Sequence, residues 1–283
     1  MTVEEFDLLT DKVRDRVIFL YFHLMGEPML HPSLPLFIRM AREKGFKTVL
    51  TSNGTLLDRT QELLDALPHK IQLSLHSHES NDSISHSFAS IEDYIDKVMQ
   101  FATVAAEKGT CMVLRLWNQG GLDAENATMI RLLEQYAPRP WVERPDGFRL
   151  APNLYLEFDR KFQWPGTNGG EDSKDESAEG SKTEGKASNA DSNEGAKPEV
   201  HCKALLKQIG VLADGSLVPC CLDHNGDVTL GNLLHQSLDE ILQSPRAKAL
   251  VEGFRHHTAT ETLCQNCESA LIKNSFRGKA RKL

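Results

Sequence analysis

The sequence contains no apolar run long enough to cross a membrane, and its first residues lack the pattern of a secretory signal. None of its hydrophobic stretches approaches the ~18 residues that a membrane-spanning helix needs. The start, Met-Thr-Val-Glu-Glu, is acidic where a signal peptide is basic and then apolar. We therefore expect a cytoplasmic protein in a reducing compartment, where clustered cysteines bind metal more often than they form disulfides.

An excess of basic residues is also absent. The 283 residues include 32 Lys and Arg against 40 Asp and Glu, which gives a net charge of −8. This balance argues against a nucleic-acid groove running over the whole surface, so no nucleic-acid partner is expected. Hydrophobic residues make up 40% of the chain, which is enough to bury a core in one large or two medium domains.

Cysteine is rare before residue 200, where Cys111 stands alone. The other five are Cys202, the adjacent pair Cys220-Cys221, and the two ends of Cys264-Gln-Asn-Cys267. Two thiolates three positions apart can reach one metal centre from a single turn, while distant segments supply the remaining ligands. This pattern indicates an iron–sulfur cluster or a structural zinc ion rather than a disulfide framework.

Strand-like and helix-like segments alternate through the first 150 or so residues. Near-continuous apolar runs, typical of buried strands, are separated by stretches of helical periodicity. Gly45 and Pro68 mark two of the helix ends. The order predicts βαβ units, an α/β fold with a parallel sheet covered by helices, and ligand binding beyond the carboxyl ends of the strands. The expected strands are 16–24, 47–51, 70–75 and 111–116, and the expected helices are 4–14, 34–44, 56–67, 91–108 and 124–136.

The composition changes over residues 167–199, which contain no aromatic residue and no Leu, Ile, Val or Met. Such a segment cannot bury enough surface to offset its ordering, so we expect a disordered acidic linker. Beyond it, the Asp214-Gly215 pair predicts a hairpin turn, and Ser237 with Glu240 predicts a helix start. This last part is small, and a metal would stabilise it. The predicted parts are an α/β domain (1–158), the linker (166–199) and a cysteine-rich α+β domain (200–283).

Polar residues follow or end the predicted strands. After the first comes Gly26-Glu27-Pro28, where glycine permits close approach to the backbone and Glu27 either accepts from an ammonium group or faces solvent. After the second comes Ser52-Asn53, which can bind hydroxyls or cap the next helix. Ser74 lies near the end of the third. Arg115 lies on the fourth, where a buried guanidinium needs an anion, either a ligand carboxylate or a structural acid.

These strand ends, in this order, resemble the radical S-adenosylmethionine (radical SAM) superfamily, in which a Gly-Glu-Pro turn, a Thr/Ser-Asn-Gly-Thr turn and a Ser-Leu-His-like strand line the cofactor pocket. The tail resembles the SPASM or shorter twitch iron–sulfur domain, through Cys202, the Asp214-Gly215 turn, Cys220-Cys221 and Cys264-x-x-Cys267. The resemblance implies a partial parallel (β/α) barrel with an iron–sulfur appendage. It further implies S-adenosylmethionine, a 4Fe–4S cluster, a reductant such as flavodoxin or ferredoxin, and radical modification of a substrate, for which a peptide or protein is the expectation.

The resemblance also assigns roles to the polar strand ends. The Gly26-Glu27-Pro28 turn is expected to hold the cofactor's ammonium group, with Glu27 as the acceptor. Ser52, Asn53 and Ser74 are expected to face its ribose or its methionine end, and Arg115 to meet its carboxylate.

For the cluster, the expected ligands are Cys202, Cys220, Cys264 and Cys267. Cys221 comes next, because adjacent residues in a strand point to opposite faces and only one of the pair should bind readily. Four protein thiolates leave no iron open, which suits a structural or electron-transfer role. Zinc remains the alternative metal.

One defining feature of the family is missing. The sequence has no Cys-x-x-x-Cys-x-x-Cys loop, whose thiolates hold the cluster that cleaves the cofactor. We expect a start at an internal methionine downstream of that loop, or else a real loss of the cluster. In either case the chain by itself is expected to be inactive. The alternative function is a non-catalytic iron–sulfur or zinc-binding scaffold protein.

Overall fold

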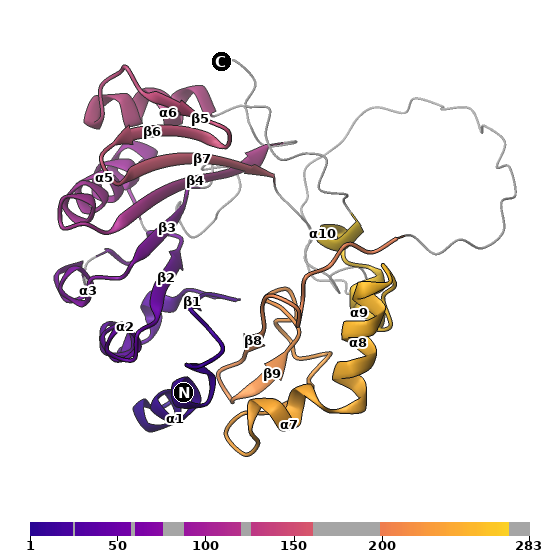
Figure 1. Cartoon of the computed structure of the whole chain (residues 1–283). Helices are drawn as coiled ribbons and strands as arrows, with labels where there is room; N and C mark the ends of the chain where they lie inside the picture. The colour runs from indigo at the N-terminus through magenta and orange to yellow at the C-terminus, as the bar shows by residue number, and fades with distance from the viewer. Residues whose placement is uncertain (25, 58–59, 76–87, 120–125, 161–198, 272–283) are drawn as a thin grey trace, which may run out of the picture.

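The strands of the α/β part form one seven-stranded sheet in the computed structural model (Figure 1). The structure describes residues 1–283 except 25, 58–59, 76–87, 120–125, 161–198 and 272–283. Five strands pair in parallel, and a β-hairpin adds an antiparallel edge, so the predicted α/β fold with a mainly parallel sheet is confirmed. In spatial order the strands are β1 (Phe19–Phe22), β2 (Lys47–Ser52), β3 (Lys70–Leu75), β4 (Cys111–Gln119), β7 (Leu154–Arg160), β6 (Gly147–Ala151) and β5 (Val142–Arg144).

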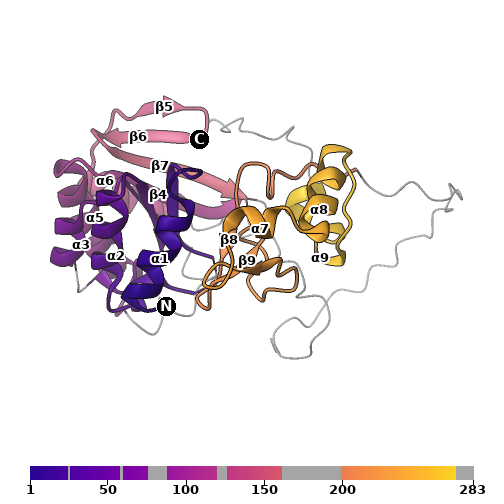
Figure 2. The same cartoon turned by 60° about the horizontal axis from the view of Figure 1, so that its bottom comes forward.

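Helices pack along one face of this sheet (Figures 1 and 2). Local signals in the sequence begin and end them. Thr2 and Glu5 form a reciprocal capping box at the first helix, and Ser90 accepts from the backbone of the longest. Gly45, at φ +91°, and Gly109, at φ +95°, allow the chain to turn after the second helix and after the longest one. The helices are α1 (Val3–Val13), α2 (Leu34–Glu43), α3 (Thr60–Ala66), α5 (Ile91–Glu107) and α6 (Asn126–Tyr136).

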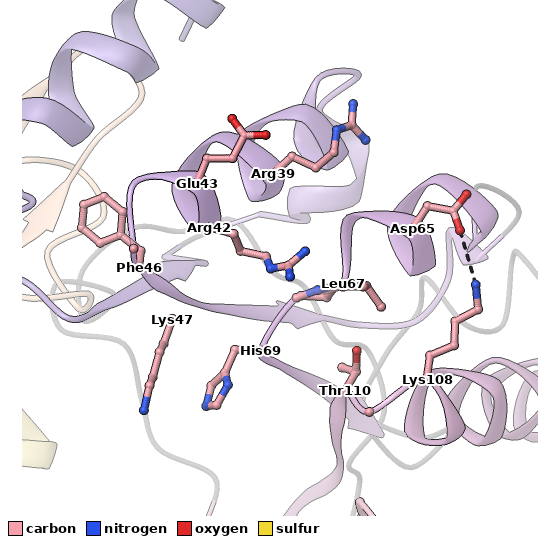
Figure 3. A pocket seen from close by; sticks show the side chains of 13 residues that line it. Arg39, Arg42, Glu43, Phe46, Lys47, Asp65, Leu67, His69, Lys108 and Thr110 are labelled. Carbon is pink, nitrogen blue, oxygen red and sulfur yellow. Dashed lines mark hydrogen bonds and ion pairs between the residues drawn. The ribbon is translucent and has the colours of Figure 1, made fainter.

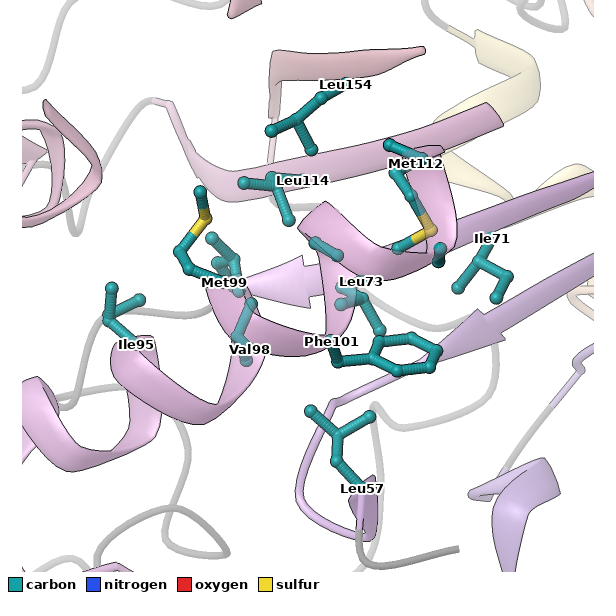
Figure 4. Packing of buried hydrophobic residues seen from close by; sticks show 14 of the residues in the cluster. Leu57, Ile71, Leu73, Ile95, Val98, Met99, Phe101, Met112, Leu114 and Leu154 are labelled. Atoms are coloured by element: carbon teal, nitrogen blue, oxygen red, sulfur yellow. The ribbon is translucent and has the colours of Figure 1, made fainter. Parts of the chain in front are cut away.

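Alternate strand positions join the sheet to these helices. Leu73 of β3 and Leu114 of β4 are fully buried in one apolar cluster with Val98 of α5 (Figure 4). Because successive strand residues point to opposite faces, Ser74 and Arg115 point to the other face of the sheet. The sheet therefore has an apolar face that packs against the helices and an opposite, polar face that carries Ser74 and Arg115.

The cysteine-rich part forms a second, smaller unit. Its three short strands pair antiparallel in the order β10, β9, β8. The predicted Asp214-Gly215 turn joins two of them, with Gly215 at φ +84°, and Ser237 and Glu240 form the predicted capping box. The elements are β8 (Gly210–Val211), β9 (Ser216–Val218), β10 (Gly231–Asn232), α7 (Leu238–Leu242), α8 (Pro245–Arg255), α9 (Thr262–Gln265) and α10 (Glu268–Leu271).

The smaller unit packs against the first two helices of the chain (Figure 2). The rings of Phe6 and Phe37 stack with centroids 4.2 Å apart, in an apolar cluster that includes Leu217 of β9. Arg16 pairs with Asp239 of α7 at 2.8 Å. This shared cluster places the cysteines relative to the sheet.

Some expectations lie outside the described residues or differ in detail. The predicted linker, 166–199, lies almost wholly in the range 161–198, which is outside the described residues. The predicted domain boundaries stay predictions. Of the helix expected at 56–67, the structure shows α3 from Thr60 to Ala66, and residues 58–59 lie outside the described ranges. Within the described ranges, no helix combines the length and apolar character needed to cross a bilayer.

Candidate metal centre and cofactor face

Four of the predicted metal ligands line one small cavity. Cys202, Cys220, Cys264 and Cys267 surround a space of about 20 Å³. They come from three segments, namely the stretch before β8, the turn after β9, and the junction of α9 and α10. The tertiary structure thus gathers sulfurs that lie far apart in the sequence. The rest of the lining is apolar and consists of Ala204, Leu222, Leu263 and Ala270.

Backbone hydrogen bonds hold these segments around the cavity. The His201 N–H donates to the carbonyl of Ala270 at 2.9 Å, which ties the Cys202 segment to α10. The Cys267 N–H lies 3.4 Å from the carbonyl of Cys264, so this pair shares one tight turn. The Ala204 N–H lies 3.4 Å from Cys202 Sγ, and hydrogen bonds of this kind stabilise a thiolate.

Cys220 and Cys221 do not lie in a strand, so the assumption behind their predicted roles is wrong. The strand β9 ends at Val218, because Pro219 has no N–H to continue the ladder. The turn that follows places Cys220 in the cavity lining, which does not include Cys221. Burial raises the pKa of the Cys221 thiol, which is also close enough to Cys267 for their charges to interact. Its role as a ligand stays a prediction.

The cavity disfavours ionised thiols unless a cation is present. Burial first, and then repulsion from the charges of neighbouring cysteines, raises the pKa of both Cys220 and Cys264 to about 12. The pKa of Cys202 is also raised, chiefly by burial. Only a positive centre can stabilise four thiolates here, so the donor set fits a metal centre that displaces the protons. Among the described residues, however, no three His, Cys, Asp or Glu side chains are spaced to hold a single metal ion.

Glu27 connects the ends of the first two strands. One carboxylate oxygen accepts from the Met29 N–H at 3.0 Å and so caps the short helix η1 (Pro28–Leu30). The other accepts from the Asn53 N–H at 2.8 Å. Gly26, at φ +94°, has the left-handed conformation that glycine adopts without strain. The carboxylate orders two turns at the carboxyl edge of the sheet, so the alternative of a purely solvent-facing Glu27 is wrong.

Ser52 and Asn53 use their side-chain oxygens within their own turn. Ser52 Oγ accepts from the Gly54 N–H at 3.0 Å, and Asn53 Oδ1 accepts from the Thr55 N–H at 3.0 Å. The Tyr94 hydroxyl of α5 donates to the Asn53 carbonyl at 2.7 Å. These side chains order the turn between β2 and α3, and because residues 58–59 lie outside the described ranges, the helix-capping alternative stays a prediction.

Arg115 has structural acids as partners. Its Nη2 lies 3.2 Å from Glu157 Oε2, and its Nε lies 3.9 Å from Asp159 Oδ2. The strand register places Ser74, Arg115 and Glu157 in one row across β3, β4 and β7. His23 lies just beyond β1 and close enough to Arg115 to be affected by its charge. Burial lowers the pKa of His23, and the positive charge of Arg115 lowers it further. The polar face therefore carries an imidazole with a lowered pKa beside a guanidinium that is paired with acids.

Comparison with known proteins finds similarities to both parts of the chain. Residues 202–268 match the family model SPASM, described as an iron-sulfur cluster-binding domain. Solved radical SAM enzymes share the overall fold. BtrN in complex with AdoMet and 2-DOIA has a TM-score of 0.50 at 18% identity, covering 98% of this chain and 85% of BtrN. The anSMEcpe structure with bound AdoMet has a TM-score of 0.55 at 12% identity, covering 96% and 80%. The chain thus shares the fold of these enzymes, and its residues 202–268 are similar to the SPASM domain.

Further similar proteins have names or titles that mention a tRNA or a peptide. Two S-adenosyl-L-methionine-dependent tRNA 4-demethylwyosine synthases, from Pyrococcus abyssi and Pyrococcus horikoshii, are 30% and 28% identical over 95 residues. That match covers 33% of this chain but only 28% of each relative's length. Streptococcus suis SuiB bound to the precursor peptide SuiA has a TM-score of 0.53 and covers 94% of this chain and 69% of SuiB.

Sequence reasoning missed three residues on the polar face of the sheet, namely His23, Glu157 and Asp159. A signal for the last two existed, because Leu154–Arg160 alternates apolar and polar residues as a two-faced strand does. No comparable signal marked His23, because its lowered pKa depends in part on Arg115, which lies on another strand.

Proposed function

We propose that the SPASM domain holds one auxiliary 4Fe–4S cluster through Cys202, Cys220, Cys264 and Cys267. The observation that carries this proposal is the convergence of four thiols from three segments on one small apolar cavity. When bound, such a cluster supplies an electron-transfer or structural centre. The protein contributes four thiolates, a dry lining and an N–H near Cys202 Sγ.

The spacing of the cysteines favours a cluster over zinc. Thiolates on one zinc ion stand about 3.8 Å apart, given zinc–sulfur bonds of about 2.3 Å and tetrahedral angles. The described residues include no three metal-binding side chains at single-ion spacing. A cubane needs wider spacing, because each thiolate binds a different iron. The five clustered thiols also suit a cytoplasmic, reducing location, which is part of the proposal.

S-adenosylmethionine is proposed to bind at the carboxyl edge of the sheet. Each Glu27 oxygen accepts one backbone N–H and keeps a second lone pair for the cofactor's ammonium group. Arg115 lies beside Glu157 on this face, where its guanidinium charge favours the approach of the cofactor's carboxylate. Ser74 lies next to Arg115 in the same row. The turn residues Gly26, Pro28, Ser52 and Asn53 are proposed to shape this pocket.

The proposed activity is the family's, namely reductive cleavage of S-adenosylmethionine and radical modification of a substrate, with a flavodoxin or ferredoxin as reductant. The sequence has no Cys-x-x-x-Cys-x-x-Cys motif, so we expect this chain alone to bind the cofactor without cleaving it. Incubation with reductant and S-adenosylmethionine should yield no 5′-deoxyadenosine. Brisk formation of that product would contradict this part of the proposal.

Two substrate classes remain in the proposal. A peptide or protein is supported by the fold shared with peptide-bound SuiB. A tRNA is the second candidate, because the names of the two archaeal relatives specify tRNA. The alternative function, a non-catalytic scaffold, predicts the same SPASM cluster with no affinity for S-adenosylmethionine.

Metal analysis tests the central claim. The protein would be purified without oxygen, and its iron, sulfide and zinc contents measured along with the visible absorbance of a cluster. Cys264→Ala and Cys267→Ala should lose the metal, because each removes one thiolate of the cavity. Cys111→Ala is the matched control, since Cys111 lies in β4 away from the cavity and should leave the metal content unchanged. Zinc in place of iron, or full iron content in both variants, would overturn the proposal.

A further inference from the structure

The edge strand β1 exposes a row of rings on the polar face of the sheet. Phe19 is 42% exposed and Tyr21 is 52% exposed, although both lie in a strand. Their ring centroids are 6.3 Å apart, and the Tyr21 and His23 centroids are 5.6 Å apart. The intervening Leu20 and Phe22 pack toward the helices. We name Phe19, Tyr21 and His23 the ring row, which leads along β1 toward Arg115.

A basic cavity of about 600 Å³ lies at the amino ends of β2, β3 and β4 (Figure 3). Two of its cations have structural roles. Arg42 donates to the Ala66 carbonyl at 2.8 Å, and Lys108 pairs with Asp65 at 3.3 Å. In the part of the chain that the structure describes, no carboxylate pairs with the other cavity cations, Arg39 and Lys47. Their charge is therefore available to a ligand.

The ring row and the basic cavity form one continuous surface. Lys47 lies opposite Phe19 in the strand register, and its Nζ is 5.6 Å from the centre of the Phe19 ring. The ring of His69, another cavity residue, is 6.1 Å from that of Phe19. Lys47 and His69 point in the same direction from neighbouring strand starts (Figure 3). A ligand on the exposed rings would thus meet positive charge at the Phe19 end.

We propose that this surface binds a single-stranded RNA segment, with bases stacked on Phe19 and Tyr21 and phosphates beside Lys47 and Arg39. Nucleic acid carries both a planar ring and a negative charge at every unit, which matches exposed rings next to unpaired cations. An acidic peptide has the charge without the regular rings, and a basic peptide would be repelled. The inference rests on the proposed function, since it names RNA as the substrate class of the same sheet.

The overall negative charge does not oppose this inference. Residues 167–199 alone carry nine acidic and four basic side chains, so this segment accounts for −5 of the net charge of −8. Electrostatic attraction to a polyanion depends on the local potential, and screening limits the effect of distant charges to about 10 Å at moderate salt.

Binding of the full-length chain to a fluorescent single-stranded RNA would be measured by anisotropy at several salt concentrations. Tyr21→Ala and Phe19→Ala should each weaken binding by about 5- to 150-fold, the range for loss of one base–ring stack. Lys47→Gln should also lower the salt slope by about 0.7, as expected for loss of one phosphate contact with a single strand. Matched controls are Tyr136→Ala and Lys248→Gln, an exposed tyrosine of α6 and an exposed lysine of α8, which should bind as the parent does.

The outcomes separate this inference from the proposed function. The RNA surface is supported if Phe19→Ala, Tyr21→Ala and Lys47→Gln bind RNA more weakly than the parent while keeping its iron content and melting temperature. Absence of RNA binding at low salt, equal binding by all variants, or tighter binding of an extended peptide to the ring row would overturn it. Iron content is measured on the same samples, because loss of iron with intact RNA binding refutes the cluster proposal alone.

Discussion

Replacing Tyr94 by Phe removes one oxygen from the interior of the α/β part. Tyr94 lies on α5, is 0% exposed, and donates to the Asn53 carbonyl at 2.7 Å. Loss of one partner of a buried hydrogen bond costs about 1–3 kcal/mol. The phenyl ring keeps its apolar contacts, so we expect Tyr94→Phe to lower the free energy of unfolding by about 1–2 kcal/mol at pH 8.

The same residue gives this prediction a pH dependence. Burial raises the pKa of the Tyr94 hydroxyl, and the negative charge of Glu27 raises it further. An unfolded tyrosine ionises near pH 10, whereas folded Tyr94 keeps its proton. Above about pH 10 the unfolded chain binds fewer protons, so the parent loses up to about 1.4 kcal/mol of stability per pH unit. Tyr94→Phe lacks this loss, and the two proteins should be equally stable near pH 11.

Urea unfolding followed by tryptophan fluorescence measures both effects, because Trp141 packs against the same core as Tyr94. At pH 8 the variant's midpoint should fall by about 0.5–1 M, for an m-value of about 2 kcal/mol per M. The control, Tyr21→Phe, changes an exposed tyrosine and should leave the midpoint unchanged. Equal stability of Tyr94→Phe and parent at pH 8, or a deficit that is the same at pH 11, would refute the reasoning.

Three further substitutions test other parts of the structure. Asp223 is 1% exposed and accepts from two backbone N–H groups at 2.8 and 2.9 Å, so Asp223→Ala should cost about 2–4 kcal/mol and speed metal loss to a chelator. Asp223→Asn keeps one of the two acceptor oxygens and should lose metal more slowly than Asp223→Ala. Gly215→Ala would place its Cβ 2.6 Å from Leu234 Cγ at φ +84°, and should lower the melting temperature of the smaller, cysteine-rich unit by several degrees. Arg115→Met removes a positive charge from beside His23, so the pKa of His23 should rise in an NMR titration, and an unchanged value would contradict the assigned cause.

Local patterns in the sequence predicted much of the fold, because they report on local physics. Runs of apolar residues marked β1 to β4, and capping residues or glycines marked several helix ends. The antiparallel edge formed by β5 to β7 was missed, since which strands pair depends on partners distant in the chain. Pairing with β7 also gave Arg115 its acidic partners, Glu157 and Asp159.

For the candidate metal centre, the sequence by itself indicated thiolate ligands, because a Cys-x-x-Cys pair together with distant cysteines is typical of iron–sulfur and zinc sites. Tertiary structure decided which thiols meet. Pro219 ends β9, and the turn that follows directs Cys220 but not Cys221 into the cavity. The ring row likewise became visible only once β1 was found at the edge of the sheet, because a strand's neighbours determine which of its side chains water can reach.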